Sequence, residues 1–269
     1  MNVKTGIFVP PFGELADPRL LAEIAEVAEV AGWDGFFVWD HLMYRDVREV
    51  ADPWICLAAI AARTERLRIG ALVTPLARRR PQVVARQLAT LDHLSRGRMV
   101  LGAALGRDTS GRELSAFGEE LDDRERAAML DEALTLIDAL WSGGPVDHHG
   151  PYYSAQDVTF APSPVQHPRI PVWIGGRWPR KAPLRRAARW DGFFPIDLAD
   201  PDQLVDCVAA LRDLRGTLDD FDVIIETAPD ADPAPWVAAG ATWWLSSFGI
   251  ARATADAVRG TAAAGPPTR

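Results

Sequence analysis

One histidine stands where its chemistry would be useful. His41, preceded by Asp40, closes an apolar run over residues 35–40 that predicts a buried β-strand. An imidazole has an unperturbed pKa of about 6.5, so it gives up or accepts a proton near neutral pH. We predict that His41 is a catalytic acid or base, with a simple loop cap as the alternative. Asp40 is a candidate for orienting a catalytic neighbour or for capping a backbone amide.

A second group of residues has the features of an anion-binding site. Gly175 and Gly176 precede Arg177 and a helical pattern that starts at about Pro179. Glycines let the backbone approach a ligand closely, and the amides at a helix start attract phosphate. These residues therefore predict a phosphate site. The three arginines at 78–80 are candidates for binding the same anion or a substrate carboxylate, but a solvated surface run is the preferred interpretation.

Other chemistries have little support. The sequence contains no Walker loop, no Ser-His-Asp order and no metal or redox spacing of cysteines, and the adjacent His148 and His149 cannot easily share one metal. Cys56 and Cys207 are expected to be small buried thiols. The net charge of −8 argues against nucleic acid or an anionic membrane as partner. No apolar run reaches the length of about 18 residues that a membrane span needs, and without a leader pattern we expect a cytoplasmic protein.

The elements that must position these residues follow a simple pattern. Short apolar runs alternate with longer segments of helical periodicity, which is typical of β-α units and a parallel sheet. The predicted strands are 6–10, 35–40, 68–74, 99–105, 172–175, 192–197, 222–228 and 242–248. The predicted helices are 17–31, 52–63, 81–95, 124–141, 182–189, 201–214, 233–239 and 251–263.

These units predict one domain over residues 1–269, a single α/β barrel of the (β/α)8 or TIM type. The alternative, an open doubly wound sheet, usually has a glycine-rich fingerprint after its first strand, and Pro11-Phe12-Gly13 stands there instead. Two connecting segments, 106–123 and 143–171, are longer than usual and predict functional loops. The second is expected to form a small hairpin at the N-terminal face of the barrel.

The active site of such a barrel lies at the carboxyl ends of its strands. This positional criterion again selects His41 and Asp40, and it makes Trp39 a candidate for flanking a planar ring. The other residues that it selects are Phe12, Gly13, Thr74, Pro75, Gly106, Arg107, Asp108, Gly175, Gly176, Arg177, Asp197, Glu226, Ser246 and Ser247.

Six segments of the chain carry a family resemblance. They are AGWDGFFVWDH at 31–41, ERLRIGALVTPLARRRP at 65–81, LATLDHLSRGRMVLGAALG at 88–106, ELSAFGE at 113–119, PSPVQHPRIPVWIGG at 162–176 and AGATWWL at 239–245. In this order they resemble the bacterial luciferase-like superfamily of flavin- and deazaflavin-dependent oxidoreductases, and LDHLSRGR is the most specific part. The resemblance implies a barrel whose central cavity holds the ring system beside a substrate pocket.

The resemblance also implies roles for individual residues. It places His41 opposite the ring, Thr74 near the cofactor, and the backbone of Gly175 and Gly176 at the cofactor phosphate. In deazaflavin-using members a non-prolyl cis peptide backs the ring, and here it is expected near Ala71–Leu72. The expected cofactor-binding residues are thus Thr74, Ala71, Leu72, Gly106, Gly175, Gly176 and Arg177, and the candidate catalytic residues are His41, Asp40 and Asp108. The loop between Gly106 and Phe117 departs from the family pattern, which leaves the carboxylate partner of His41 open.

The Trp-Asp-His ending of the second strand and the arginine-rich turn after VTPL look closer to deazaflavin-using relatives, so F420 is favoured over FMN. The predicted function is hydride transfer between F420 and a small organic substrate, with His41 moving the accompanying proton. The alternatives are an FMNH2-dependent monooxygenase that uses O2, and a non-catalytic flavin-binding barrel. A homodimer and a separate flavin or F420 reductase are the expected protein partners.

Overall fold

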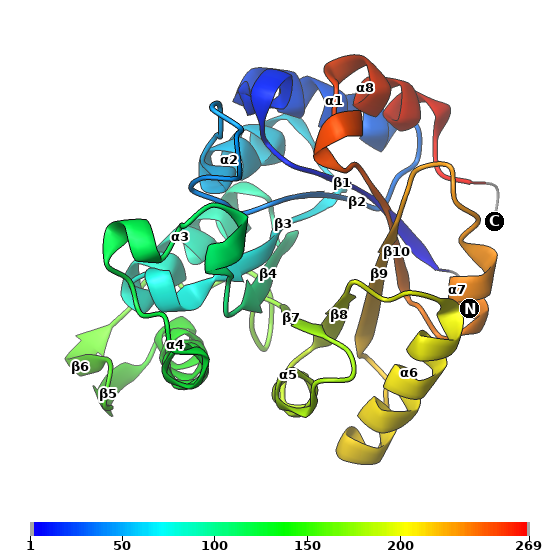
Figure 1. The fold of residues 1–269 in the computed structure, drawn as a ribbon. Helices are drawn as coiled ribbons and strands as arrows, with labels where there is room; N and C mark the ends of the chain where they lie inside the picture. The colour runs from blue at the N-terminus through cyan, green and yellow to red at the C-terminus, as the bar shows by residue number, and fades with distance from the viewer. Residues whose placement is uncertain (1–2, 268–269) are drawn as a thin grey trace.

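Eight parallel strands close into a barrel in the computed structural model, which describes residues 3–267 (Figure 1). Their order around the barrel is β1-β10-β9-β8-β7-β4-β3-β2. The barrel strands are β1 (Lys4–Val9), β2 (Gly35–Val38), β3 (Arg68–Pro75), β4 (Met99–Ala104), β7 (Val172–Arg177), β8 (Gly192–Ile196), β9 (Asp222–Thr227) and β10 (Trp243–Ser247). The predicted (β/α)8 architecture and the predicted strand positions are confirmed.

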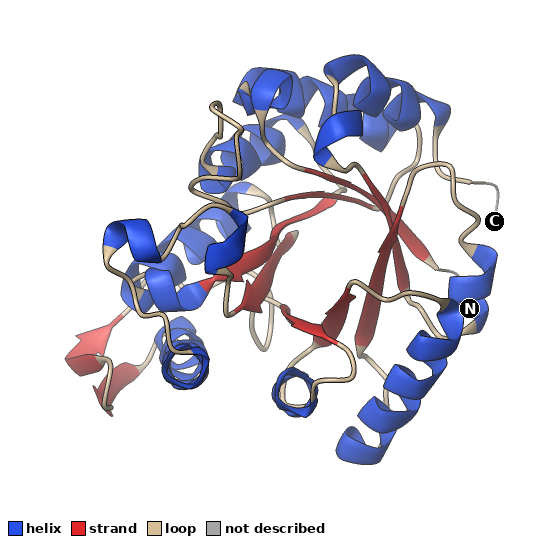
Figure 2. Ribbon diagram, in the orientation of Figure 1, coloured by secondary structure: helices blue, strands red, loops and turns tan. Residues whose placement is uncertain are grey.

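Helices surround the barrel, as Figure 2 shows. They are α1 (Pro18–Val30), α2 (Pro53–Arg63), α3 (Pro81–Leu94), α4 (Asp123–Trp141), α5 (Lys181–Ala187), α6 (Pro201–Arg215), α7 (Ala234–Ala238) and α8 (Ala255–Ala264). Three of them start with an aspartate that accepts hydrogen bonds from the first free amides and with a proline in the first turn, and the caps are Asp17, Asp52 and Asp200. The last helix starts four residues later than the predicted 251, because a 3-10 turn occupies Ile250–Arg252.

Aromatic side chains fill the barrel interior toward the amino-terminal ends of the strands. Phe37, Trp173 and Trp243 lie with their ring centroids 5.4 to 5.6 Å apart, and all three are buried. Trp173 and Trp243 lie in the amino-terminal halves of β7 and β10, and Phe37 is the third of the four residues of β2, so these rings fill the barrel interior toward its amino-terminal end. A binding site inside the barrel must therefore lie near the carboxyl ends of the strands.

Strand β3 departs from regular geometry next to that end. Its register with β4 shifts between Ala71 and Thr74, and a non-prolyl cis peptide joins Leu72 to Val73. The expected position, near Ala71–Leu72, was one bond too early. Gly102 of β4 is required here, because a Cβ atom at that position would lie 2.4 Å from the carbonyl oxygen of Ala71.

The predicted hairpin in segment 143–171 forms, but not where it was expected. Its strands β5 (Pro145–His149) and β6 (Ser154–Thr159) pair in antiparallel fashion. They lie alongside α4 rather than at the N-terminal face, because Glu132 binds His148 and Glu125 accepts a hydrogen bond from Tyr152 (Figure 1). The hairpin thus packs against α4.

Two further predictions concern burial. Cys56 and Cys207 are free and fully buried, and burial raises the pKa of each thiol to about 12, so both are inert packing residues as predicted. None of the helices formed by residues 3–267 has the length and apolar character that crossing a membrane requires.

Candidate active site at the carboxyl ends of the strands

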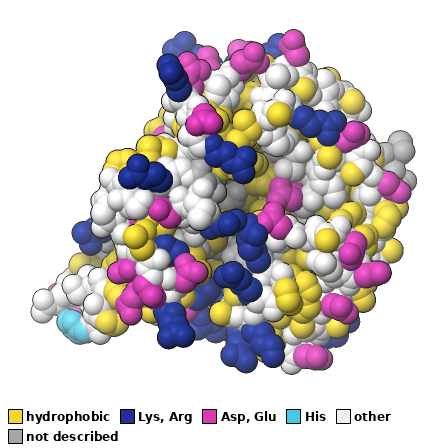
Figure 3. All heavy atoms as spheres, in the orientation of Figure 1, with side chains coloured by type: hydrophobic (Ala, Val, Ile, Leu, Met, Phe, Trp, Pro, Cys, Tyr) yellow, Lys and Arg dark blue, Asp and Glu magenta, His cyan; other side chains and the backbone are white. Residues whose placement is uncertain are grey.

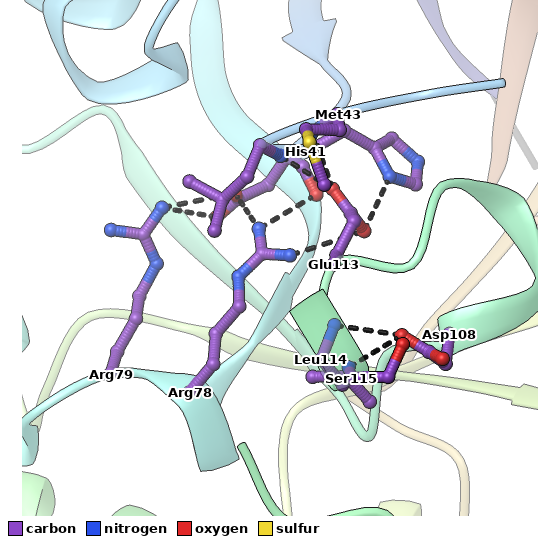
Figure 4. Close-up of polar contacts among 10 residues, drawn as sticks. His41, Met43, Arg78, Arg79, Asp108, Glu113, Leu114 and Ser115 are labelled. Atoms are coloured by element: carbon purple, nitrogen blue, oxygen red, sulfur yellow. Dashed lines mark hydrogen bonds and ion pairs between the residues drawn. The ribbon is translucent and has the colours of Figure 1, made fainter. Parts of the chain in front are cut away.

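His41 is paired with a carboxylate that sequence reasoning did not identify. Its Nδ1 lies 2.9 Å from Oε2 of Glu113, and the His41 side chain is 24% exposed whereas that of Glu113 is 2% exposed (Figure 4). Glu113 also accepts hydrogen bonds from the backbone amides of Leu42 and Met43, at 2.5 and 3.1 Å. Because a carboxylate only accepts, Nδ1 carries a proton and Nε2 is the nitrogen left to exchange one.

Two arginines hold the carboxylates of this cluster. Arg78 lies 2.6 Å from Asp40 and 3.2 Å from Glu113, and Arg79 lies 2.9 Å from Asp40. The Arg78 and Asp40 side chains are 3% and 0% exposed, so the preferred interpretation of 78–80 as a solvated run was wrong for Arg78. A buried ion pair of this kind fixes the positions of its side chains, because removal of one partner would leave the other charge buried without a counter-charge.

The charges around Glu113 keep it ionised. Burial raises the pKa of its carboxyl, but the hydrogen bond and charge of His41, the charge of Arg78 and the Met43 amide outweigh burial and bring the pKa below its usual value. The candidate site thus contains a permanent negative charge directly behind the histidine. That charge stabilises a protonated imidazole, as a general base requires after it has taken a proton.

Asp108 has a different place from the one predicted. Its carboxylate accepts hydrogen bonds from the amides of Leu114 and Ser115, at 2.8 and 2.9 Å, and these bonds lower its pKa (Figure 4). Within the described chain Asp108 has no contact with His41. It shapes the loop that carries Glu113, so we regard it as a positioning residue.

The loops after β2 and β4 are in contact at a glycine. A Cβ atom at Gly111 would lie 2.4 Å from the carbonyl oxygen of Met43, closer than real Cβ atoms come. A Cβ atom at Gly106, whose φ is 75°, would lie 2.7 Å from the Pro75 side chain at the end of β3. Both glycines allow the loop after β4 to lie against the loop after β2 and the end of β3. This contact brings Glu113 to His41, which is 72 residues away in the sequence.

The residues predicted to bind a cofactor divide between two sides of β3. Leu72 belongs to the inner aromatic cluster of the barrel and Val73 packs against it, whereas Ala71 belongs to the outer cluster beneath the helices. Thr74 pairs in register with Ala103, which is also an outer residue, so the Thr74 side chain faces the helices. Only the backbone of Ala71 and Thr74 can then contact a ligand inside the barrel.

The glycines of β7 have a packing role. A Cβ atom at Gly175 would lie 2.7 Å from the Val73 side chain, and one at Gly176 would lie 2.3 Å from Pro183 of α5. Arg177 pairs with Asp197, which follows β8. The phosphate site at these residues stays a prediction, and the structure shows that tight packing alone already requires both glycines.

The inner side of β4 has small residues toward the mouth of the barrel. Val100 points into the inner cluster, and the alternate residues after it are Gly102, Ala104 and Gly106, which have little or no side chain. Figure 3 shows a hollow at the centre of this face, with acidic and basic side chains around it. A flat ring system fits such a small-residue surface better than bulky inner side chains would allow.

Trp39 completes the surroundings of His41. Its ring contacts those of Phe8, Phe12 and His41, with centroids 5.9 to 6.0 Å apart. Among residues 3–267 its buried Nε1 has no hydrogen-bond partner. That Trp39 flanks a planar ring stays a prediction. The unpaired Nε1–H group supports it, because a buried donor usually has a hydrogen-bond partner.

Comparison with known proteins agrees with this geometry. The family model described as luciferase-like monooxygenase matches residues 3–239. An F420-dependent glucose-6-phosphate dehydrogenase of Microbacterium testaceum is 35% identical over 81% of this chain and 67% of its own length. The chain covers about two thirds of the length of the first curated relatives that it matches.

Solved structures share the fold. The coenzyme F420-dependent tetrahydromethanopterin reductase of Methanopyrus kandleri has a TM-score of 0.79 at 17% identity, covering 98% of this chain and 99% of that one. An F420-dependent secondary alcohol dehydrogenase, solved with an F420-acetone adduct, has a TM-score of 0.78 at 20% identity and the same coverage. With the family model matched over most of its length, this chain belongs to the luciferase-like monooxygenase family.

Proposed function

We propose that this chain is an oxidoreductase that transfers a hydride between F420 and a small organic substrate. The observation that carries the proposal is the His41–Glu113 pair at the carboxyl ends of the strands, with Nε2 of His41 unpaired in the described chain and the ring partly exposed. The names of the curated relatives support the choice of F420 over FMN.

A bound deazaflavin supplies reversible two-electron hydride chemistry. An alcohol that loses a hydride from its carbon must also lose the proton of its hydroxyl group. His41 accepts that proton at Nε2, and Glu113 stabilises the resulting imidazolium from the other side of the ring. In the opposite direction His41 returns the proton to the carbonyl oxygen. Leu72, Val73, Gly106 and the β7 glycines are the residues that would hold the ring and its phosphate.

The description of the family favours one second candidate, an FMNH2-dependent monooxygenase. Such an enzyme reacts with O2 and needs a separate flavin reductase. The two candidates differ in a simple way, because hydride transfer to F420 proceeds without oxygen and oxygenation does not.

The test of the proposal is the rate of hydride transfer, followed from F420 absorbance under anaerobic conditions. We expect His41→Asn to lower this rate by about 10²–10⁴-fold, which is the usual worth of a general acid or base. His149→Asn is the matched control, because His149 is exposed on the hairpin. A loss of less than about threefold for His41→Asn would make His41 a spectator.

We further propose a homodimer formed through α2 and α3, where Ile55 and Val83 are 62% and 49% exposed. We also propose a cytoplasmic location, because the two free cysteines fit a reducing compartment. Sedimentation of the purified protein tests the dimer: a monomer at micromolar concentration would exclude it.

A further inference from the structure

A pocket of about 340 Å³ lies between the carboxyl ends of β8, β9 and β10. One part of its wall is apolar and includes Pro195, Leu198, Ile225 and Trp236. The other part includes the polar side chains of Glu226 and Ser247. A pocket with apolar walls and a few converging polar groups is the usual form of a small-molecule site.

Glu226 and Ser247 point into the barrel. Ile224 and Leu245 belong to the inner cluster, and residues two positions apart on a strand face the same side. Glu226 and Ser247 are those next inner residues, and Oγ of Ser247 donates a 2.7 Å hydrogen bond to Oε2 of Glu226. They therefore form a polar pair at the mouth of the barrel.

The pair shares this mouth with His41. Ser247 is in register with Phe8 of the neighbouring β1, and the Phe8 ring contacts Trp39, whose ring in turn contacts His41. Glu226 is thus connected to His41 through Ser247 and the rings of Phe8 and Trp39. A substrate bound at one side of the opening can extend toward the other.

Positive charge around the pocket is already matched. Arg252 is the only cation among the lining residues, and it pairs with Asp230 at 3.1 Å. Asp197, also in the lining, pairs with Arg177 from β7. A phosphate or carboxylate group here would find no unpaired guanidinium or ammonium and would lie beside Glu226 and Asp197. Anion sites in proteins are usually built the other way, around uncompensated Arg or Lys.

We infer that this pocket receives the substrate of the proposed oxidoreductase, and that Glu226 and Ser247 hydrogen-bond an uncharged hydroxyl or carbonyl group of it. The inference rests on the proposed function and deepens it: the substrate class is neutral alcohols or carbonyl compounds, and phosphate esters and carboxylates are rejected. In this respect the chain differs from the relatives named for glucose 6-phosphate.

The surroundings of Glu226 agree with this role. Burial raises the pKa of its carboxyl, the Ser247 hydrogen bond lowers it, and the charge of Asp197 raises it further, so the net direction is upward. A hydroxyl group can donate a hydrogen bond to this carboxyl, and the Ser247 hydroxyl can donate one to a carbonyl group. An anionic partner would instead leave polar groups mismatched in a low-dielectric wall.

The experiment compares matched substrates on the F420-loaded protein: cyclohexanol with trans-4-hydroxycyclohexanecarboxylate, and glucose with glucose 6-phosphate. We expect kcat/KM to favour the uncharged member of each pair by about 10²-fold. Glu226→Ala should raise KM for the uncharged substrate about tenfold with kcat within about threefold, and Glu226→Gln should restore most of the loss. Glu26→Gln on exposed α1 is the matched control. Preference for a charged member, or an unchanged KM in Glu226→Ala, would overturn the inference.

A binding measurement without cofactor separates this inference from the proposed function. Saturation-transfer NMR should show cyclohexanol bound to the wild type and to Glu26→Gln but not to Glu226→Ala, with Ser247→Ala as the substitute if Glu226→Ala does not fold. Binding of this kind without F420 turnover would support the pocket and refute the F420 reaction. Turnover confined to charged substrates, or equal binding by wild type and variants, would refute the pocket and leave the reaction intact.

Discussion

Two glutamates, the buried Glu113 and the half-buried Glu226, lie on opposite sides of the barrel mouth, and their surroundings move their pKa values in opposite directions. Glu113 is held by His41, Arg78 and two backbone amides, so its pKa lies below the usual value. Glu226 has a single hydroxyl partner and a nearby carboxylate, so burial dominates and its pKa lies above that value. One mouth therefore holds a carboxylate and a carboxyl that is protonated more readily, a combination suited to separate tasks.

The Glu113 pKa predicts how one variant responds to acid. A carboxyl whose pKa is lowered by folding stabilises the folded state above its unfolded pKa, and this contribution is lost as pH falls through the folded pKa. We expect Glu113→Gln to be less stable than wild type at pH 7, with a gap that narrows below about pH 4.5. Tm measured from pH 7 to pH 3 checks this, and a gap that widens in acid would contradict it.

The Glu226 pKa predicts the opposite sign. A carboxyl whose pKa is raised by folding contributes stability that is complete at low pH and is lost as pH rises through the folded pKa. Relative to wild type, Glu226→Gln should therefore gain stability as pH rises above about 4.5, because glutamine cannot ionise in the pocket wall. Chemical denaturation at several pH values measures the difference. A constant offset across that range would show that Glu226 titrates as it does in the unfolded chain.

At the scale of elements, the site depends on two loops that the barrel holds side by side. The loop after β2 supplies His41, and the loop after β4 supplies Glu113 and has Gly111 against the backbone of Met43. Asp108 stabilises the second loop through the amides of Leu114 and Ser115. The histidine is thus positioned by contacts between loops in addition to its own strand.

This arrangement predicts the effect of a single methyl group. In Gly111→Ala the new Cβ would lie 2.4 Å from Met43 O, so the loops must separate and Glu113 must move from His41. We expect hydride transfer to slow by about tenfold or more while Tm changes little, since misplacement by about 1 Å is costly to catalysis and loops contribute little to global stability.

Gly144→Ala is the matched control for that variant, because its Cβ would meet Ser142 Oγ at an ordinary 3.6 Å. Anaerobic F420 kinetics and thermal unfolding of the two variants give the comparison. Equal rates in Gly111→Ala and Gly144→Ala would mean that contact between the loops does not position the histidine.

The elements themselves were largely predictable from the sequence. Short apolar runs and helical patterns, together with Asp-Pro helix starts, located the eight barrel strands and the helices, because these signals are local. The pairing of His41 with Glu113 was not predictable, although Glu113 begins the matched segment 113–119. It depends on how two irregular loops meet across the barrel mouth. The burial of Arg78 was missed for the same reason, since its carboxylate partners come from distant parts of the chain.

At the scale of the whole molecule, the two ends of the barrel have different roles: one is packed for stability, and the other carries the candidate site. Phe37, Trp173 and Trp243 fill the barrel interior toward its amino-terminal end, and the His41–Glu113 pair lies at the other end. The pattern of eight units predicted this division, because the carboxyl ends of barrel strands carry the site. The offset between the expected and observed cis peptide, and the hairpin along α4, show the limit of such reasoning: both depend on contacts between elements.

We propose that this barrel uses F420 and that His41 is its proton-transfer group. Titration of the purified protein with F420 and FMN in parallel, followed by fluorescence, tests it most directly. We predict micromolar or tighter binding of F420, weaker binding of FMN, and anaerobic turnover of bound F420 that His41→Asn slows by about 10²–10⁴-fold without loss of F420 affinity. Submicromolar binding of FMN with no measurable binding of F420 would contradict it.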